Sequence, residues 1–330
     1  MRVTVLGGGS WGTALAHVMA CNGFAVTLLM RDADRAGALN ETRENPRYLP
    51  GLKLHEGITA LADPVAGLTG ADIVVLAVPC QHLRGTLRAL GRYMPGHAVP
   101  VCAGKGIEVS TLKRMSEVVA ELLPDQAARY AILSGPSFAK EVVEGKPAAV
   151  VLGCAEAGLG ERLREHFSSA LFRVYSSTDV AGVELGGAVK NVMAIAAGLC
   201  DGLGLGHNAR AALITRGLAE MSRLGIAMGA RPSTFMGLSG MGDLVLTCTG
   251  DLSRNRQVGM RLAAGETMAE IASAMHMVAE GVKTTEAVCL LGDSLGVELP
   301  IAEAVRRIVV DGEKPRDMVR ELMARALREE

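Results

Sequence analysis

The chain has 330 residues, enough for two domains with substantial cores, and its 49% hydrophobic content with 40 glycines is typical of a globular protein. A formal net charge of −1 gives no overall attraction for nucleic acid or an anionic membrane surface. Seven cysteines and seven histidines are scattered without a C-x-x-C or H-E-x-x-H spacing. These counts predict a reduced, cytoplasmic chain with no disulfide framework and no metal site.

The first sixteen residues carry a recognisable nucleotide-binding pattern. Residues 3–6 predict a short buried strand, Gly7, Gly9 and Gly12 follow at G-x-G-x-x-G spacing, and a helix is predicted from Thr13. In this pattern the first glycine permits the turn off the strand, the second lets a pyrophosphate approach the backbone, and the third lets helix and strand pack closely. The N–H groups of the new helix would then point at the phosphates.

Strand-like and helix-like segments alternate over residues 1–178, which predicts an α/β fold with a doubly wound, Rossmann-type parallel sheet. The segment 72–78 is almost continuously apolar, as expected for a parallel strand that is covered on both faces. The further candidate strands are residues 25–30, 98–102, 131–134, 148–152 and 172–175. The apolar segments 73–79 and 192–200 are too short to span a bilayer.

Residues 179–330 show helical spacing and little that predicts strand, so we expect an all-helical C-terminal domain. No Pro/Ser-rich linker marks the boundary. Two apolar stripes at helical spacing are Ala211, Ile214, Leu218, Met221 and Leu224 in one segment, and Val319, Leu322, Met323 and Ala326 in the other.

The end of the second predicted strand carries Arg31 and Asp32, where an acidic residue favours NAD and a basic one accommodates the 2′-phosphate of NADP. Arg31 favours NADP(H), with use of both cofactors left open. The alternative is that Arg31 is a solvated charge and Asp32 caps the next helix.

Two loops after later strands bring polar groups to the ligand-binding edge of the sheet. Lys105 lies on a glycine-flanked loop, where it could polarise a carbonyl or bind phosphate, or simply be a surface lysine in a turn. Ser137 follows the turn at residues 135–136, and its alternative role is the N-cap of a helix that starts there.

Lys190 interrupts a long apolar, small-residue helical segment in residues 187–198. A lysine there either reaches out to solvent or is functional. Removing an ammonium group from water makes it lose its proton more readily, which suits a general acid/base.

A glycine-rich loop at residues 237–243 ends in Asp243, and Ser253, Arg254 and Asn255 follow it. These three supply hydroxyl, guanidinium and amide donors, with Arg254 able to clasp a phosphate. Alternatively, Asp243 caps a turn and Ser253 caps a helix. Residues 278–285 form another small polar turn before a helix, for which ordinary helix-start chemistry is the alternative.

Taken together, the motifs resemble the soluble bacterial type of NAD(P)-dependent glycerol-3-phosphate dehydrogenase. The matching blocks lie in the family's order over most of the chain. They are GGGSWGTALA (7–16), NPRYLPG (45–51), GKGIE (104–108), SGPSFAKEV (134–142), KNVMAIAAG (190–198), GLGLGHNARAALITRGLAEM (202–221), GLSGMGDL (237–244), SRNR (253–256) and VAEGVKT (278–284).

This resemblance implies reduction of dihydroxyacetone phosphate to sn-glycerol 3-phosphate with NADPH or NADH, a product that feeds phospholipid synthesis, and a homodimer formed through the helical domain. Lys190 matches the family's proton donor and acceptor, and Lys105 a residue near both cofactor and substrate. Asp243 orients Lys190 or bonds a substrate hydroxyl. The further substrate positions are Gly135, Ser137, Asp243, Ser253, Arg254 and Asn255. The cofactor positions, with Arg254 shared, are Gly7, Gly9, Ser10, Trp11, Gly12, Arg31, Lys105, Ala139, Val278 and Glu280.

Two rival interpretations stay open on the residues alone. One is a different two-domain dehydrogenase of the 3-hydroxyacyl-CoA, 6-phosphogluconate or ketopantoate reductase type, against which the phosphate-binding donors at residues 253–255 argue. The other is an NADP(H)-sensing protein, which would need the glycine loop but not Lys190, Asp243 and the SRNR group (253–256) together.

Overall fold

The computed structural model describes residues 1–275 and 279–326. The chain forms two compact units, and the boundary between them lies within a long helix, α8 (Val180–Gly202). The first unit comprises Met1–Lys105 and Lys113–Glu184, and the second joins residues 106–112 to the chain from Leu185 onward.

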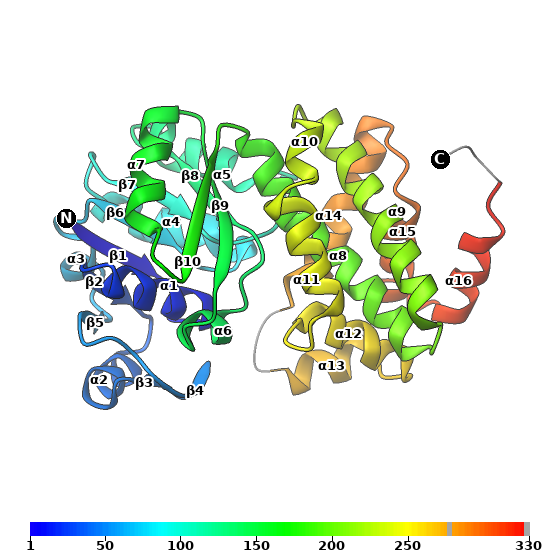
Figure 1. The fold of residues 1–330 in the computed structure, drawn as a ribbon, viewed down its shortest axis with the longest axis horizontal. Helices are drawn as coiled ribbons and strands as arrows, with labels where there is room; N and C mark the ends of the chain where they lie inside the picture. Colours follow the sequence, from blue (N-terminus) through cyan, green and yellow to red (C-terminus); the bar gives the residue numbers. More distant parts are fainter. Residues whose placement is uncertain (276–278, 327–330) are drawn as a thin grey trace. The chain divides into compact units, whose positions relative to one another are not determined.

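The first unit contains, in the described part of the chain, a sheet with the order β5-β2-β1-β6-β7-β8-β9-β10 (Figure 1). Its strands are β1 Arg2–Leu6, β2 Ala25–Leu29, β5 Ile58–Leu61, β6 Ile73–Leu76, β7 Val99–Cys102, β8 Ala131–Ser134, β9 Ala148–Cys154 and β10 Phe172–Ser177. The chain runs outward from β1 in both directions, and β1 pairs in parallel with β2 and β6. A ligand site is expected at such a switch point, outside the carboxyl ends of the strands. The predicted Rossmann-type sheet is therefore confirmed.

One detail of the sheet differs from the prediction of parallel strands throughout. β9 pairs antiparallel with β8, and β10 follows β9 in parallel, so the last two strands are reversed. Between β8 and β9 the chain forms only α6 (Ala139–Val143). A helix of five residues rises about 7.5 Å, less than the roughly 13 Å spanned by a four-residue strand, so this short connection favours an antiparallel neighbour over a parallel crossover.

The edge strand β5 and a small hairpin, β3 (Glu44–Asn45) with β4 (Leu49–Lys53), were not predicted. Both are short and carry no clean alternation of apolar and polar residues, which is the signal that strand prediction uses.

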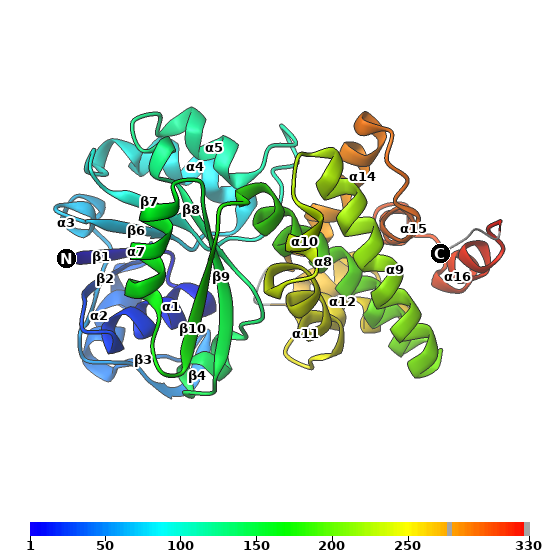
Figure 2. The same ribbon diagram turned by 45° about the horizontal axis from the view of Figure 1, so that its top comes forward.

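Helices cover both faces of the sheet, because alternate strand residues point to opposite sides. On one face Val3 and Val5 pack with α1 (Ser10–Cys21) and α7 (Ala157–Phe167). On the other face Leu76 packs with α4 (Cys80–Leu90) and α5 (Met115–Leu122). Figures 1 and 2 show α1 and α7 on the same side of the sheet. The remaining helices of this unit are α2 Ala33–Thr42 and α3 Pro64–Leu68, with short turns at Gly91–Tyr93 and Ala127–Arg129.

The second unit is helical wherever the structure describes regular elements, as predicted. After α8 come α9 Gly206–Ala227, α10 Pro232–Phe235, a π-helical turn at Leu238–Gly242, α11 Asp243–Thr249, α12 Arg254–Ala263, α13 Met268–Ala274, α14 Glu280–Leu295, α15 Pro300–Val309 and α16 Pro315–Met323. Helix α8 is long and apolar enough to cross a membrane by length and composition, but its most apolar window is completely buried inside the protein. It is thus the core helix of this unit.

The two predicted apolar stripes differ in how far their side chains are buried. On α9, Leu218, Met221 and Leu224 are buried, whereas Ala211 is exposed. On α16 the predicted helix is found, but its stripe does not face the core, since Met323 is 81% exposed and the side chain that packs inward is Met318. This short terminal helix has α15 as its main neighbour, so only one narrow side of it is covered.

Helices α8 and α12 cross closely because glycines face each other's backbone. A Cβ atom on Gly198 would lie 2.0 Å from the carbonyl oxygen of Arg256, and one on Gly259 would lie 2.1 Å from that of Ile195. No side chain can be inserted at such distances, so these glycines set the spacing of the two helices.

Glu220 of α9 caps the start of another helix. Its carboxylate accepts hydrogen bonds from the backbone N–H groups of Ile301 (2.7 Å) and Ala302 (3.2 Å) at the start of α15. Burial raises the pKa of Glu220 to about 7, although these two hydrogen bonds favour the charged form. Because the folded-state pKa lies above the ordinary value of 4.5, the charged carboxylate costs stability once the pH rises through this interval.

We expect the free energy of unfolding to fall between about pH 4.5 and pH 7 relative to the Glu220→Gln variant, which does not titrate. The full effect is on the order of 3 kcal/mol, at about 1.4 kcal/mol per pKa unit. Urea unfolding of both proteins at several pH values measures this difference and cancels other titrating groups. A difference that is constant across the interval would contradict the assignment.

Candidate active site

The glycine loop after β1 has the geometry of a dinucleotide-binding turn. Gly7 adopts φ +117°, a conformation that favours glycine. A Cβ on Gly12 would lie 2.0 Å from the carbonyl oxygen of Gly7, so only glycine fits there. Gly9 is the N-cap residue of α1, and a Cβ there would meet no atom within 4 Å. A pyrophosphate that approaches the N-terminus of the helix needs both features: the close packing at Gly12 and the open space at Gly9.

Asn45 holds this loop from a distant part of the chain, a role that the sequence analysis did not assign. Its buried side-chain amide donates to the carbonyl oxygen of Gly8 (3.0 Å) and to Thr13 Oγ1 (2.9 Å). Ser10 Oγ donates to the carbonyl oxygen of Tyr48 (3.3 Å) in the same segment. Residue periodicity carries no signal for such a contact, and only the conspicuous block 45–51 pointed to this segment.

The indole of Trp11 gives an independent indication of a ligand. Its Nε1 is buried and has no hydrogen-bond partner within the described protein. An orphaned donor of this kind costs free energy unless a ligand accepts from it. Together with the open space at Gly9, it shows that the first unit's residues fit a dinucleotide cofactor.

At the end of β2, the structure confirms that Asp32 caps the next helix. Asp32 is the N-cap of α2, and its Oδ1 accepts from the backbone N–H of Arg35 at 3.1 Å. Arg31 is exposed, and no ion pair or hydrogen bond of its side chain is found in the part of the chain described. Contact of Arg31 with a 2′-phosphate stays a prediction.

Lys105, Gly135 and Ser137 come together in the first unit. Lys105 Nζ and Ser137 Oγ each donate to the carbonyl oxygen of Gly135 at 2.9 Å. The alternative of Ser137 as an N-cap is wrong: α6 begins at Ala139 with Phe138 as its cap residue, because the Ser137 hydroxyl turns back to Gly135. Their contacts with substrate, and that of Ala139 with cofactor, stay predictions.

In the second unit, Lys190 forms a buried polar cluster with two residues of α11. Its Nζ lies 2.7 Å from Asp243 Oδ1 and 2.7 Å from Thr247 Oγ1. The Lys190 side chain is 9% exposed and that of Asp243 1% exposed, so the solvent-reaching alternative is wrong. Thr247 was missed, although its spacing of four residues from Asp243 on one helix was a usable signal. The same burial raises the pKa of the neighbouring Cys248 thiol to about 12, which leaves it inert.

The predicted glycine-rich loop before Asp243 is a helical turn instead. The π-helical turn Leu238–Gly242 runs directly into α11, where Asp243 is the first residue, so Asp243 does not cap a turn. A Cβ on Gly240 would lie 2.1 Å from the carbonyl oxygen of Phe235. Glycine here therefore permits close packing of α10 rather than loop flexibility.

Ser253, Arg254 and Asn255 lie at the start of α12. Ser253 is the N-cap, as the structural alternative predicted, and its Oγ accepts from the N–H of Arg256 at 3.3 Å. Asn255 Nδ2 donates to Asn191 Oδ1 (2.9 Å), and Asn255 Oδ1 accepts from the N–H of Gly281 (3.0 Å). Arg254 is half-buried and is the first residue of the helix. Their substrate contacts stay predictions.

Glu280 and Val278 are the two remaining predicted cofactor positions. Glu280 is the first residue of α14, and Val278 lies outside the described residues. No group of three or more metal-ligating side chains was found in the described segments. Arg256, the fourth residue of the SRNR block, has a structural role, since it pairs with Asp201 (2.8 Å) and Asp251 (3.0 Å).

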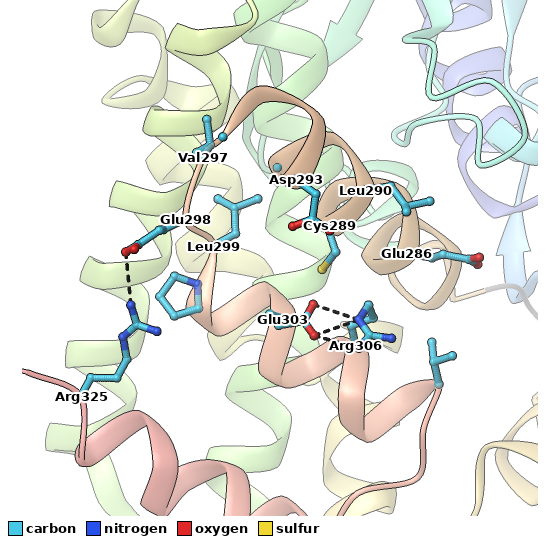
Figure 3. Close-up of a pocket in the computed structure, with 14 residues that line it drawn as sticks. Glu286, Cys289, Leu290, Asp293, Val297, Glu298, Leu299, Glu303, Arg306 and Arg325 are labelled. Atoms are coloured by element: carbon cyan, nitrogen blue, oxygen red, sulfur yellow. Dashed lines mark hydrogen bonds and ion pairs between the residues drawn. The ribbon is translucent and has the colours of Figure 1, made fainter.

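A separate pocket of about 760 Å³ lies in the second unit, between α14 and α15 (Figure 3). None of its lining residues is a predicted site residue. Its charges are largely paired, Glu303 with Arg306 (2.8 Å) and Glu298 with Arg325 (3.2 Å). Burial and Glu303 raise the pKa of its Cys289 thiol to about 12. The pocket therefore offers no reactive group to the chemistry described above.

Comparison with known proteins agrees with this geometry. The family model of the NAD-dependent glycerol-3-phosphate dehydrogenase N-terminus matches residues 2–159, and that of the C-terminus matches residues 179–320. This chain belongs to the NAD-dependent glycerol-3-phosphate dehydrogenase family. The resemblance found in the sequence is thus confirmed, and so is the expected NAD(P) cofactor.

Individual relatives of the family match over their whole length. Glycerol-3-phosphate dehydrogenases (NAD(P)+) of Oleidesulfovibrio alaskensis and Nitratidesulfovibrio vulgaris are each 62% identical to this chain over 330 residues, with full coverage of both chains. The crystal structure of glycerol-3-phosphate dehydrogenase from Coxiella burnetii is 38% identical, with a TM-score of 0.93 and coverage of 98% of this chain and 99% of that one.

The glycines of the family's fingerprint loop provide a matched pair of variants. Gly12→Ala places a Cβ against backbone, and we expect it to lower stability by about 3 kcal/mol, the upper end for overpacking. Gly9→Ala meets open space, so we expect unfolding within about 0.5 kcal/mol of wild type but weaker NADPH binding, because the Cβ occupies space that the pyrophosphate needs. Thermal unfolding and calorimetric titration measure both. A Gly9→Ala protein with undiminished affinity would refute this geometry.

Proposed function

We propose that this chain reduces dihydroxyacetone phosphate to sn-glycerol 3-phosphate, with a proton from Lys190 and a hydride from NAD(P)H. The observation that carries the proposal is the buried cluster of Lys190, Asp243 and Thr247, an ammonium group held by two oxygen acceptors at 2.7 Å. Such a group has the charge and the proton that a carbonyl oxygen needs when it becomes an alkoxide. Family membership supplies the reaction to which this chemistry is applied.

Lys190 Nζ gives its proton to the substrate oxygen and so quenches the negative charge that develops there. Asp243 keeps the ammonium charged and oriented in its buried site, and Thr247 Oγ1 fixes a second direction of the same group. Thr247 Oγ1 also donates to the Asp243 carbonyl oxygen at 2.6 Å, which fixes its own lone pairs toward the lysine. Lys105 is proposed to add positive charge near the reacting carbonyl.

The cofactor is held by the first unit. Gly7, Gly9 and Gly12 form the turn that admits the pyrophosphate, with Ser10 and Trp11 at the helix start. Ala139, Glu280 and Val278 are proposed as further contacts, together with Arg254. The bound nicotinamide supplies the hydride. Use of NADPH is favoured by Arg31, with NADH also accepted.

The phosphate of the substrate is proposed to bind at the start of α12. Arg254 offers a guanidinium for two-pronged contact, and Ser253 and Asn255 add hydroxyl and amide groups. Binding energy from this remote group positions the reacting carbon. Gly135 and Ser137 are proposed as further substrate contacts.

We also propose the domain organisation, the oligomeric state and the cellular location of this chain. Residues 1–178 form the dinucleotide-binding domain and residues 179–330 the substrate and dimerisation domain, supported by the family models' separate matches. Exposed apolar side chains on the helical unit, including Met236 and Val245, support a homodimer that sedimentation analysis would detect. The free, mostly buried cysteines support a cytoplasmic enzyme, and the buried α8 supports the absence of stable membrane insertion. The net charge of −1 supports the absence of a nucleic-acid partner. The product is proposed to feed phospholipid synthesis.

Lys190→Ala should lower kcat by about 100-fold or more, the scale of a lost general acid, while NADPH still binds. The measurement is steady-state reduction of dihydroxyacetone phosphate, with cofactor binding followed by calorimetry. Because Asp243 is left unpaired and buried, thermal unfolding must confirm that the variant is folded at the assay temperature. Near-normal turnover would remove Lys190 from the mechanism.

Arg254→Ala should mainly raise KM for dihydroxyacetone phosphate, by about 10- to 100-fold for a lost charge-assisted hydrogen bond of about 1.5–3 kcal/mol. Its neighbour Arg256 is the matched control: Arg256 contacts Asp201 and Asp251, so Arg256→Lys should leave KM nearly unchanged. An unchanged KM in Arg254→Ala would exclude the phosphate contact.

A further inference from the structure

Next to the fingerprint loop lies a group of three arginines for which the described residues provide no ion pair. Arg35, in the first turn of α2, has its guanidinium carbon 5.1 Å from the centre of the Tyr48 ring, and that of Arg47 lies 5.7 Å from the same ring. Throughout residues 1–275 and 279–326, neither of these arginines nor Arg31 lies within ion-pair distance of an Asp or Glu side chain. Elsewhere in the chain, the half-buried Arg114 and Arg256 do have such partners, Glu184 and Asp201.

The contacts of Arg35 lead directly to the cofactor loop. Its Nη2 donates weakly to Asn45 Oδ1 (3.5 Å), and the amide of Asn45 holds the Gly8 carbonyl oxygen. Tyr48, whose ring carries the two guanidiniums, accepts from Ser10 through its carbonyl oxygen. Figure 1 shows α2 and β3 side by side, in agreement with these contacts. The arginines therefore belong to the same local structure as the pyrophosphate turn.

Arg31 and Arg35 flank one residue, Asp32, which caps α2. Arg31 precedes this cap by one position, and Arg35 follows it by three. The Asp32 carboxylate is turned to the backbone N–H of Arg35. At the end of β2, where an acidic side chain would select the 2′-hydroxyl of NAD, the one that follows Arg31 is thus engaged by the start of α2, and arginines lie on both sides of it.

A half-buried guanidinium with only an amide oxygen and a ring face beside it is under-compensated, because removing its charge from water is costly. Its planar set of donors fits a phosphate in two-pronged fashion, and stacking on an aromatic ring leaves those donors available at the rim. A phosphate dianion would supply the charge that the protein lacks at this point.

We propose that Arg35, stacked on Tyr48 with Arg47 and acting beside Arg31, is a specificity-determining residue that binds the 2′-phosphate of NADP(H). This inference rests on the proposed function, since it concerns the adenosine end of the same cofactor. It assigns selection of NADP over NAD to a platform made by α2 and the β3–β4 segment, not to Arg31 alone.

Calorimetric titration of two cofactor fragments tests the proposal without any turnover. Adenosine 2′,5′-bisphosphate carries the 2′-phosphate, and adenosine 5′-monophosphate lacks it. The wild-type protein should bind the bisphosphate more tightly. Arg35→Gln should weaken the bisphosphate by about 10-fold or more, the scale of one lost charge-assisted hydrogen bond, and change the monophosphate less than twofold. Arg31→Gln should show the same selective loss.

The matched control is Arg92→Gln. Arg92 also stacks on a tyrosine of the first unit, with its guanidinium carbon 4.7 Å from the Tyr93 ring centre, but it lies in the short turn Gly91–Tyr93 that follows α4. This variant should bind both fragments like wild type. Arg35→Lys keeps the charge without the planar donors and should fall between wild type and Arg35→Gln.

The outcomes separate this inference from the proposed function. Equal weakening of both fragments in Arg35→Gln would mean that Arg35 acts only through Asn45 on the loop, and would overturn the inference. Unchanged binding of the bisphosphate would also overturn it, while turnover with dihydroxyacetone phosphate would leave the proposed function standing. If the wild-type protein turned over no dihydroxyacetone phosphate while Arg35→Gln showed the selective loss, the proposed function would fail and the phosphate site would stand.

Discussion

The ammonium group of Lys190 is buried in the core helix of the second unit, and this placement depends on Asp243 and Thr247 of α11. A buried charge is tolerated only when an opposite charge and hydrogen bonds replace the water it has lost. Both acceptors lie at 2.7 Å from Nζ, and Asp243 is almost completely covered. Removing one member of such a pair typically costs about 3–5 kcal/mol, so the polar cluster and the fold of this unit are maintained together.

The surrounding helices show how a polar cluster is accommodated in an apolar core. Gly186 of α8 lies against the π-helical turn, where a Cβ would approach the Ser239 carbonyl oxygen to 2.5 Å. Farther along α8, Gly198 packs against α12 in the same way. These close approaches bring the starts of α11 and α12 to the helix that carries Lys190. The small residues of α8, conspicuous in the sequence, are thus a requirement of helix spacing.

Much of this could be predicted because it depends on backbone rules. Gly7, Gly9 and Gly12 follow from the steric demands of a strand–turn–helix, and each strand from β6 onward was found close to its predicted residues. The reversal of β9, the roles of Asn45 and Thr247, and the exposure of Met323 could not be predicted. Each depends on which distant segment packs beside a residue, and local periodicity does not contain that information. Ser137 shows the same limit, since a hydroxyl after a turn can bond forward to a helix or back to Gly135.

The two units treat charge in different ways, and the difference follows from what each must hold. The helical unit neutralises its buried charges internally: Lys190 with Asp243, Asp201 with Arg210 and Arg256, and Glu220 with backbone N–H groups. The nucleotide-binding unit does so for Glu184, which receives Arg114, Ser116 and Tyr130 and whose pKa burial nevertheless raises. Around the fingerprint loop, however, Arg31, Arg35 and Arg47 have no acidic partner among the described residues. Arginines without an ion pair, beside backbone N–H groups at a helix start, stabilise the fold little, but an anionic cofactor would supply the charge that they lack.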